Sequence, residues 1–71
     1  MRVNKYKIIL FNSQNKYRNL EKIIKSENRV SVVKYDVKIF IKQICLKYGW
    51  SFKEYQKYYD KYKVIKIGGD K

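Results

Sequence analysis

The sequence contains no histidine and no proline, and Cys45 is its single cysteine. One cysteine excludes a disulfide within the chain, and zinc sites built from several Cys and His ligands are excluded as well. No segment approaches the ~20 apolar residues of a membrane span, and the first residues lack the apolar core of a signal peptide. We therefore expect no metal, no cofactor and no membrane partner. The expected location is intracellular: the cytoplasm or nucleoid, an organelle, or a virus-infected cell.

Acidic residues are also scarce, since six Asp and Glu stand against eighteen Lys and Arg and give a formal net charge of +12 in 71 residues. Such a charge makes a small folded domain repel itself, so a polyanion is the expected partner. Codon bias is the competing explanation, because Lys, Ile, Asn and Tyr have A/T-rich codons and Ala and Thr are absent. That bias explains Lys over Arg, but it does not explain the shortage of Asp and Glu.

The chain is long enough for one small domain, residues 1–71, with 68–71 as a frayed tail. Alternating and helical apolar patterns predict the order strand, helix, strand, helix, helix, strand. The expected bounds are strands at 3–12, 30–35 and 63–67, and helices at 16–27, 37–48 and 52–62. The predicted fold is a small α+β domain, β-α-β-α-α-β, with three helices against a small sheet that the N-terminal strand completes.

The clearest local signals lie between residues 36 and 62. Apolar side chains repeat at helical spacing at Val37, Phe40, Ile41, Ile44, Cys45 and Tyr48. Asp36 is placed to cap the start of that helix, and Gly49 to end it in the left-handed conformation. Ser51 and Glu54 fit a capping box, so a second helix is expected to begin at Phe52. A turn this short predicts a sharp crossing of the two helices.

This unit resembles the helix-turn-helix superfamily over about 41–59. The positions that carry the resemblance are Ile44, Cys45, Tyr48, Gly49, Trp50, Ser51, Tyr55 and Tyr58. From its second element onward, the predicted order is similar to that of a winged-helix domain without its last strand. The resemblance implies binding to duplex DNA with helix 52–62 in the major groove, and a homodimer if the DNA sequence is read specifically.

The side of the last helix opposite its aromatic stripe carries Lys53, Gln56 and Lys57. Gln can pair with adenine and Lys can donate to guanine, while Glu54 and Asp60 would repel phosphates. An ordinary solvated helix face is the alternative interpretation. The candidate nucleic-acid-binding residues are Ser51, Lys53, Gln56, Lys57, Lys61, Lys38, Lys42, Lys47, Arg18, Lys22 and Lys25.

Three other functions remain open at this stage. A small RNA-binding or ribosome-associated protein would stack tyrosines on unpaired bases, and Tyr58 is the one expected to be most exposed. A virus- or plasmid-encoded inhibitor would bind a protein instead. A small RNA-cleaving toxin would need Tyr, Lys, Arg or carboxylates as its acids and bases, because histidine is absent. We expect a non-enzymatic protein, with DNA favoured over RNA.

Overall fold

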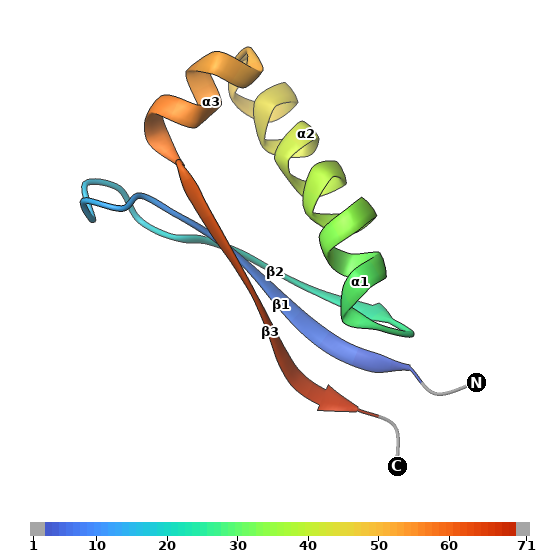
Figure 1. Cartoon of the computed structure of the whole chain (residues 1–71). Coiled ribbons are helices and arrows are strands. Elements are labelled where there is room, and N and C mark those ends of the chain that lie inside the picture. Colours follow the sequence, from blue (N-terminus) through green and yellow to red (C-terminus); the bar gives the residue numbers. More distant parts are fainter. Residues whose placement is uncertain (1–2, 70–71) are drawn as a thin grey trace.

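The computed structural model describes residues 3–69 and shows the expected α+β class in a single small domain. The elements are β1 (Asn4–Phe11), β2 (Leu20–Ser26), α1 (Arg29–Ser31), the π-helical segment η1 (Val32–Asp36), α2 (Val37–Tyr48), α3 (Phe52–Tyr58) and β3 (Lys61–Gly69). α1, η1 and α2 follow one another without a break and form one continuous helix (Figure 1). The class prediction is therefore confirmed, while two of the elements are of a different type than expected and α3 and β3 have different bounds.

The three strands form an antiparallel sheet in the order β2-β1-β3, so the N-terminal strand is the central one. Ile8 of β1 lies opposite Lys22 of β2 and Val64 of β3. Because directly opposed residues share a face of the sheet, this register assigns the paired strand residues to one of two faces, while an irregularity between Lys5 and Tyr6 leaves Ile67 of β3 without an opposed residue. The helices lie over one of these faces, and β3 crosses the view diagonally in front of β1 and β2 (Figure 1).

The core lies between that face of the sheet and the helices. Tyr6, Ile8 and Leu10 of β1 are buried at every second position, with Ile8 and Leu10 fully inaccessible. They belong to one buried cluster with residues of η1, α2, α3 and β3 and with Tyr59, which follows α3; these residues are Val32, Val37, Phe40, Ile44, Tyr55, Tyr59 and Val64. The alternating pattern of β1 and the helical pattern of α2 thus meet in a single interior.

The predicted helix at 16–27 is wrong, because residues 20–26 form β2. Leu20 and Ile24 fit a strand as well as a helix, and pairing with β1 supplies partners for the backbone groups along one edge of the central strand. Lys22 lies between them on the helix-facing side. Its Nζ donates to Gln43 Oε1 at 2.8 Å and lies 5.8 Å from the centre of the Phe40 ring. A lysine therefore occupies an inward position without burying its charge.

The predicted strand at 30–35 is also wrong, because these residues are helical. The Asn28 side chain accepts a hydrogen bond from Ser31 N at 2.8 Å and caps a helix that begins at Arg29. Asp36 is therefore inside the helix and makes no capping bond. Val32 becomes fully buried in this arrangement, which outweighs the strand preference of its β-branched side chain.

The predicted end of α2 and start of α3 are confirmed. Gly49 has φ 69° and Ser51 Oγ accepts from Glu54 N at 3.2 Å. α3, however, ends at Tyr58 instead of continuing to residue 62. The Asn12 side chain donates to Tyr58 O at 2.9 Å and so takes up a carbonyl at the end of the helix. β3 begins at Lys61 and includes Gly68 and Gly69, so the predicted frayed tail begins too early; residues 70–71 lie outside the described residues.

Candidate nucleic-acid interface

One face of the sheet carries no helix in the part of the chain that the structure describes. We call it the open face, and the strand register defines its members. They are Lys5, Lys7, Ile9, Phe11, Glu21, Ile23, Lys25, Lys61, Lys63 and Ile65. The first four come from the central strand, so the open face extends across all three strands.

The open face is strongly basic, with five lysines against one carboxylate. That carboxylate, Glu21, is already paired with Lys7, at an N–O distance of 3.1 Å. Lys5 and Lys25 lie directly opposite each other on neighbouring strands. Like charges in that position destabilise a sheet, and no other ion pair within residues 3–69 relieves them. The fold therefore concentrates positive charge here at some cost to its own stability.

Apolar side chains lie between these lysines. Phe11 lies opposite Lys61 and Ile9 opposite Lys63, and both apolar side chains are half-buried. Ile23 and Ile65 lie on either side of Lys7 and are exposed. A face that alternates lysine with flat or branched apolar groups offers contacts to phosphates and to bases or sugars at once.

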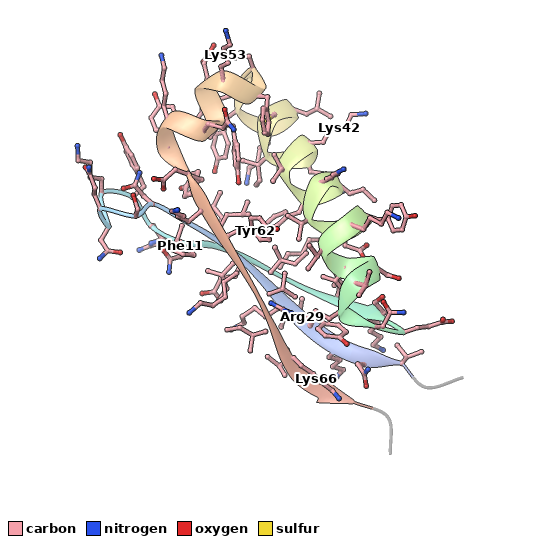
Figure 2. All side chains as sticks on the ribbon, viewed as in Figure 1. Phe11, Arg29, Lys42, Lys53, Tyr62 and Lys66 are labelled. Carbon is pink, nitrogen blue, oxygen red and sulfur yellow. The ribbon has the colours of Figure 1, made fainter. Side chains whose placement is uncertain are left out.

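The second basic surface is the outer side of α3. Lys53, Gln56 and Lys57 are exposed there, while Tyr55 is buried on the inner side. Figure 2 shows Lys53 projecting from this end of the molecule. With seven residues, α3 makes about two turns and is about 10 Å long. Lys53, Gln56 and Lys57 thus share one exposed side as predicted, on a shorter helix than expected, whereas Lys61, predicted within the same helix, belongs to β3.

Asp60 no longer belongs to that surface, because it follows the helix. Its carboxylate accepts from Ser13 N at 2.9 Å and from Ser13 Oγ at 2.6 Å. These hydrogen bonds, with that from the Ser13 hydroxyl the largest contribution, hold the pKa of Asp60 below its usual value. Asp60 would therefore repel phosphates near the loop after α3 and not at the helix surface, where the repulsion was predicted. Glu54 is the exposed acidic residue of α3.

The aromatic residues near the α2–α3 turn mostly pack on one another. Trp50 stacks between Tyr48 and Tyr58, with ring centroids 4.8 and 4.6 Å away. Tyr17 meets Tyr58 edge-on at 5.1 Å. Tyr58 is therefore half-buried, and the expectation that it would be the most exposed tyrosine of the helical stripe is wrong. Tyr48 and Tyr62 are more exposed.

The other predicted contact residues are dispersed. Lys22 and Lys25 lie on opposite faces of β2, because neighbouring odd and even positions of a strand alternate. Arg18 is exposed in the loop before β2, and Ser51 is exposed with its hydroxyl used as the α3 cap. Exposed lysines of α2 are Lys38, Lys42 and Lys47.

Only Lys25 and Lys61 of the predicted set reach the open face. Sequence reasoning missed their neighbours Lys5, Lys7 and Lys63 because residues 20–26 were expected to be helical. A signal for two of them was present in the alternation of lysine with apolar residues in β1.

No protein-family profile, curated protein or solved structure matches the chain. Within residues 3–69, no group of three or more His, Cys, Asp or Glu side chains is arranged to hold a metal ion. Among the described helices, none combines the length and apolar character required to cross a membrane.

Proposed function

We propose that this protein binds nucleic acid without catalysing a reaction. The observation that supports the proposal is the open face, where five lysines and a single, already paired carboxylate lie on a surface left uncovered by the described helices. Lys5 and Lys25 repel each other in register, and a row of phosphates would remove that repulsion. Contacts between lysine and phosphate give affinity without sequence preference.

The dimensions of the open face suit a nucleic-acid backbone. β1 has eight residues, so its length is about 26 Å, and three strands are about 10 Å wide between the outer strand axes. Lysines occur at both ends of this strip and on each strand. Phe11 and Ile9 lie between them and offer apolar contacts to sugars or unstacked bases. Such a strip can follow several successive phosphates.

Duplex DNA is the favoured ligand, and α3 is the candidate for reading it. The support is local: Gly49 and Ser51 form the expected turn, and Lys53, Gln56 and Lys57 share the exposed side of the following helix. In this version of the proposal α3 enters the major groove, as the helix-turn-helix resemblance implies, and lysines of α2 contact the backbone. Two turns of helix reach few bases, so specific binding would require a dimer.

A salt titration with matched double variants distinguishes the two surfaces. Lys25→Gln/Lys63→Gln removes two charges from the open face, and Lys53→Gln/Lys57→Gln removes two from α3. Lys34→Gln/Lys66→Gln is the control, because it removes two exposed lysines that belong to neither surface. Binding to a random duplex is measured by fluorescence anisotropy from low to moderate salt. Each lost phosphate contact lowers the slope of log affinity against log salt by about 0.9.

If the open face binds, its variant lowers the slope by about 1.8 while the control changes it little. An equal decrease in slope that is found only in the α3 variant would indicate that α3, and not the open face, binds the DNA. A wild-type affinity that does not vary with salt would contradict nucleic-acid binding altogether.

RNA is the alternative ligand and is tested in the same assay. Competition between duplex DNA and a structured RNA at one salt concentration compares the two directly, because phosphate contacts alone favour neither strongly. A preference for unpaired RNA that is lost in Phe11→Ala would indicate stacking on the open face. Equal competition would indicate that only the backbone is bound.

A further inference from the structure

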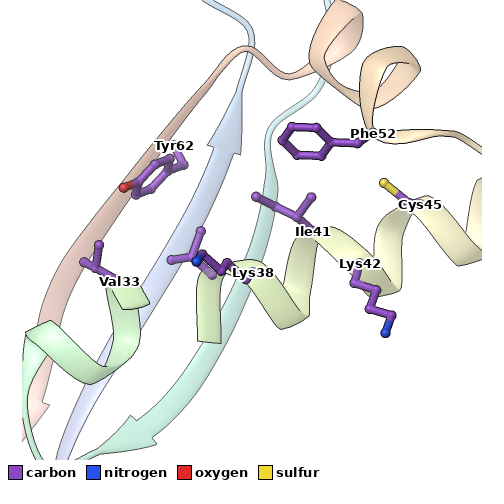
Figure 3. A pocket seen from close by; sticks show the side chains of 8 residues that line it. Val33, Lys38, Ile41, Lys42, Cys45, Phe52 and Tyr62 are labelled. Carbon is purple, nitrogen blue, oxygen red and sulfur yellow. The ribbon is translucent and has the colours of Figure 1, made fainter. Parts of the chain in front are cut away.

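A groove beside the continuous helix is a second surface, separate from the open face. It lies on the helix side of the sheet, has a volume of about 510 Å³, and is lined mainly by apolar groups from α2, α3 and β3. Figure 3 shows Ile41 of α2, Phe52 of α3 and Tyr62 of β3 directed toward the same space. We call it the α2–β3 groove. Phe52 is 58% exposed and Tyr62 is 49% exposed, so large rings of its wall remain in contact with water.

The helical wall of this groove consists of two parallel stripes. Val33, Val37, Ile41 and Cys45 recur every fourth residue and form the apolar stripe. Lys34, Lys38 and Lys42 follow one position later and form the basic stripe; Lys38 and Lys42 also line the groove. Rows of residues at i and i+4 are the ridges by which helices pack against one another. No carboxylate is present among the lining residues.

The length of the apolar stripe corresponds to a short helix. From Val33 to Cys45 the chain advances twelve helical positions, or about 18 Å and somewhat more than three turns. The opposite wall is one ring of β3, Tyr62, and the upper end is closed by Phe52 of α3. A second helix lying beside α2 would cover this stripe along its whole length.

We propose that the α2–β3 groove binds an amphipathic helix of a partner protein whose apolar stripe is flanked by acidic residues. The apolar wall accounts for the apolar stripe of the ligand, and the basic stripe accounts for its acidic flank. A second copy of this chain is a poor occupant, because it would bring its own basic stripes to the basic rim at a net charge of +12 each. A membrane surface is flat, and the apolar groups here lie in a recess.

Cys45 supplies a direct readout, because it is the single cysteine and lines the groove. The rate of its alkylation by iodoacetamide is measured with and without synthetic helical peptides of about 18 residues. One peptide has a leucine stripe flanked by glutamates, and the other has the same stripe flanked by lysines. At a peptide concentration about ten times Kd, an occupied groove slows alkylation by about tenfold. We expect protection by the glutamate peptide and little by the lysine peptide.

Two sets of variants test the two features of the groove. Lys38→Glu/Lys42→Glu should weaken the glutamate peptide by about fivefold or more and reverse the preference toward the lysine peptide. Phe52→Ser should reduce protection because it removes an exposed ring from the groove wall. Leu46→Ser is its control: Leu46 is 74% exposed on α2 and does not line the groove. Circular dichroism checks that each variant remains folded.

Several outcomes would overturn the proposal. Equal protection by both peptides would remove the charge argument, and no protection by either would remove the groove as a helix site. Protection by anionic vesicles but not by peptide would indicate a membrane surface instead. Protection that grows with protein concentration alone would indicate a second copy. None of these outcomes bears on the open face, which is tested with DNA and with variants of Lys25 and Lys63, so the two proposals fail separately.

Discussion

Replacement of Asn12 by alanine tests how the end of β1 is joined to the end of α3. Asn12 is 6% exposed and is the only buried polar residue between positions 3 and 68. Its Nδ2 donates to Tyr58 O at 2.9 Å, and its Oδ1 accepts from Gln14 N at 2.9 Å. A longer bond from Lys16 N, at 3.5 Å, reaches the same oxygen. One side chain thus caps α3 and shapes the loop after β1.

The expected cost follows from these contacts. Asn12→Ala leaves the Tyr58 carbonyl and the Gln14 N–H without a protein partner, and each such loss costs about 1–1.5 kcal/mol at a part-buried site. The sum is about 2–3 kcal/mol. A chain of 71 residues has a free energy of unfolding of about 4–10 kcal/mol. The variant should therefore lose a large fraction of its stability, and its Tm should fall by about 10–20 °C.

Urea unfolding followed by the fluorescence of Trp50, the single tryptophan, measures this loss. Ser13→Ala is the matched control. It removes a neighbouring but exposed hydrogen bond, from Ser13 Oγ to Asp60 Oδ2, so we expect a loss of less than about 1 kcal/mol. A loss below about 0.5 kcal/mol for Asn12→Ala, with an unchanged denaturant slope, would refute the reasoning.

Three further predictions concern stability. Gly49→Ala should lower the free energy of unfolding, measured in urea, by about 1–2 kcal/mol because the φ of Gly49 is 69°. Gly49→Asn should lower it less. No atom lies within 4 Å of the added Cβ, so an unchanged stability of Gly49→Ala would contradict the backbone explanation. Ile8→Ala should cost about 2–5 kcal/mol because Ile8 is fully buried, and Ile23→Ala on the open face less than about 1 kcal/mol; equal losses would contradict the assigned faces.

The third concerns pH: burial raises the pKa of Tyr55 and of Tyr59 above the usual value. The unfolded chain therefore loses these protons at a lower pH than the folded protein does. The free energy of unfolding should have its full value below about pH 10 and should fall as the pH rises further. Urea unfolding between pH 8 and 11 tests this, and Tyr55→Phe should reduce the fall.

Residues 36–58 show how far local signals determine the structure. Gly49 and Ser51 act within their own turns: a left-handed residue ends α2, and a hydroxyl caps α3. These effects do not depend on distant residues, so they could be predicted from the sequence, as could the central apolar stripe of α2 and the alternation of β1. The α+β class followed from the same local patterns.

The two wrong secondary-structure predictions concern segments whose local sequence suits both a helix and a strand. Residues 20–26 suit a helix or a strand, and the free edge of β1 decided for the strand. Residues 30–35 are β-branched and suit a strand, yet the cap at Asn28 and the burial of Val32 decided for the helix. The strand partner of residues 20–26 and the buried site of Val32 are supplied by distant parts of the fold, out of reach of a local pattern, whereas the Asn28 cap is a local signal within the sequence.

The basic charge shows the same division. Sequence alone determined that the protein carries +12 and therefore that a polyanion is the expected partner. Which lysines act together was decided only by the tertiary structure, because the register of β1 with β2 and β3 brings Lys5, Lys25 and Lys63 to one face and turns Lys22 to the other. A strand reverses the face of each successive residue, so the composition of a surface depends on which segments become strands and on how they pair.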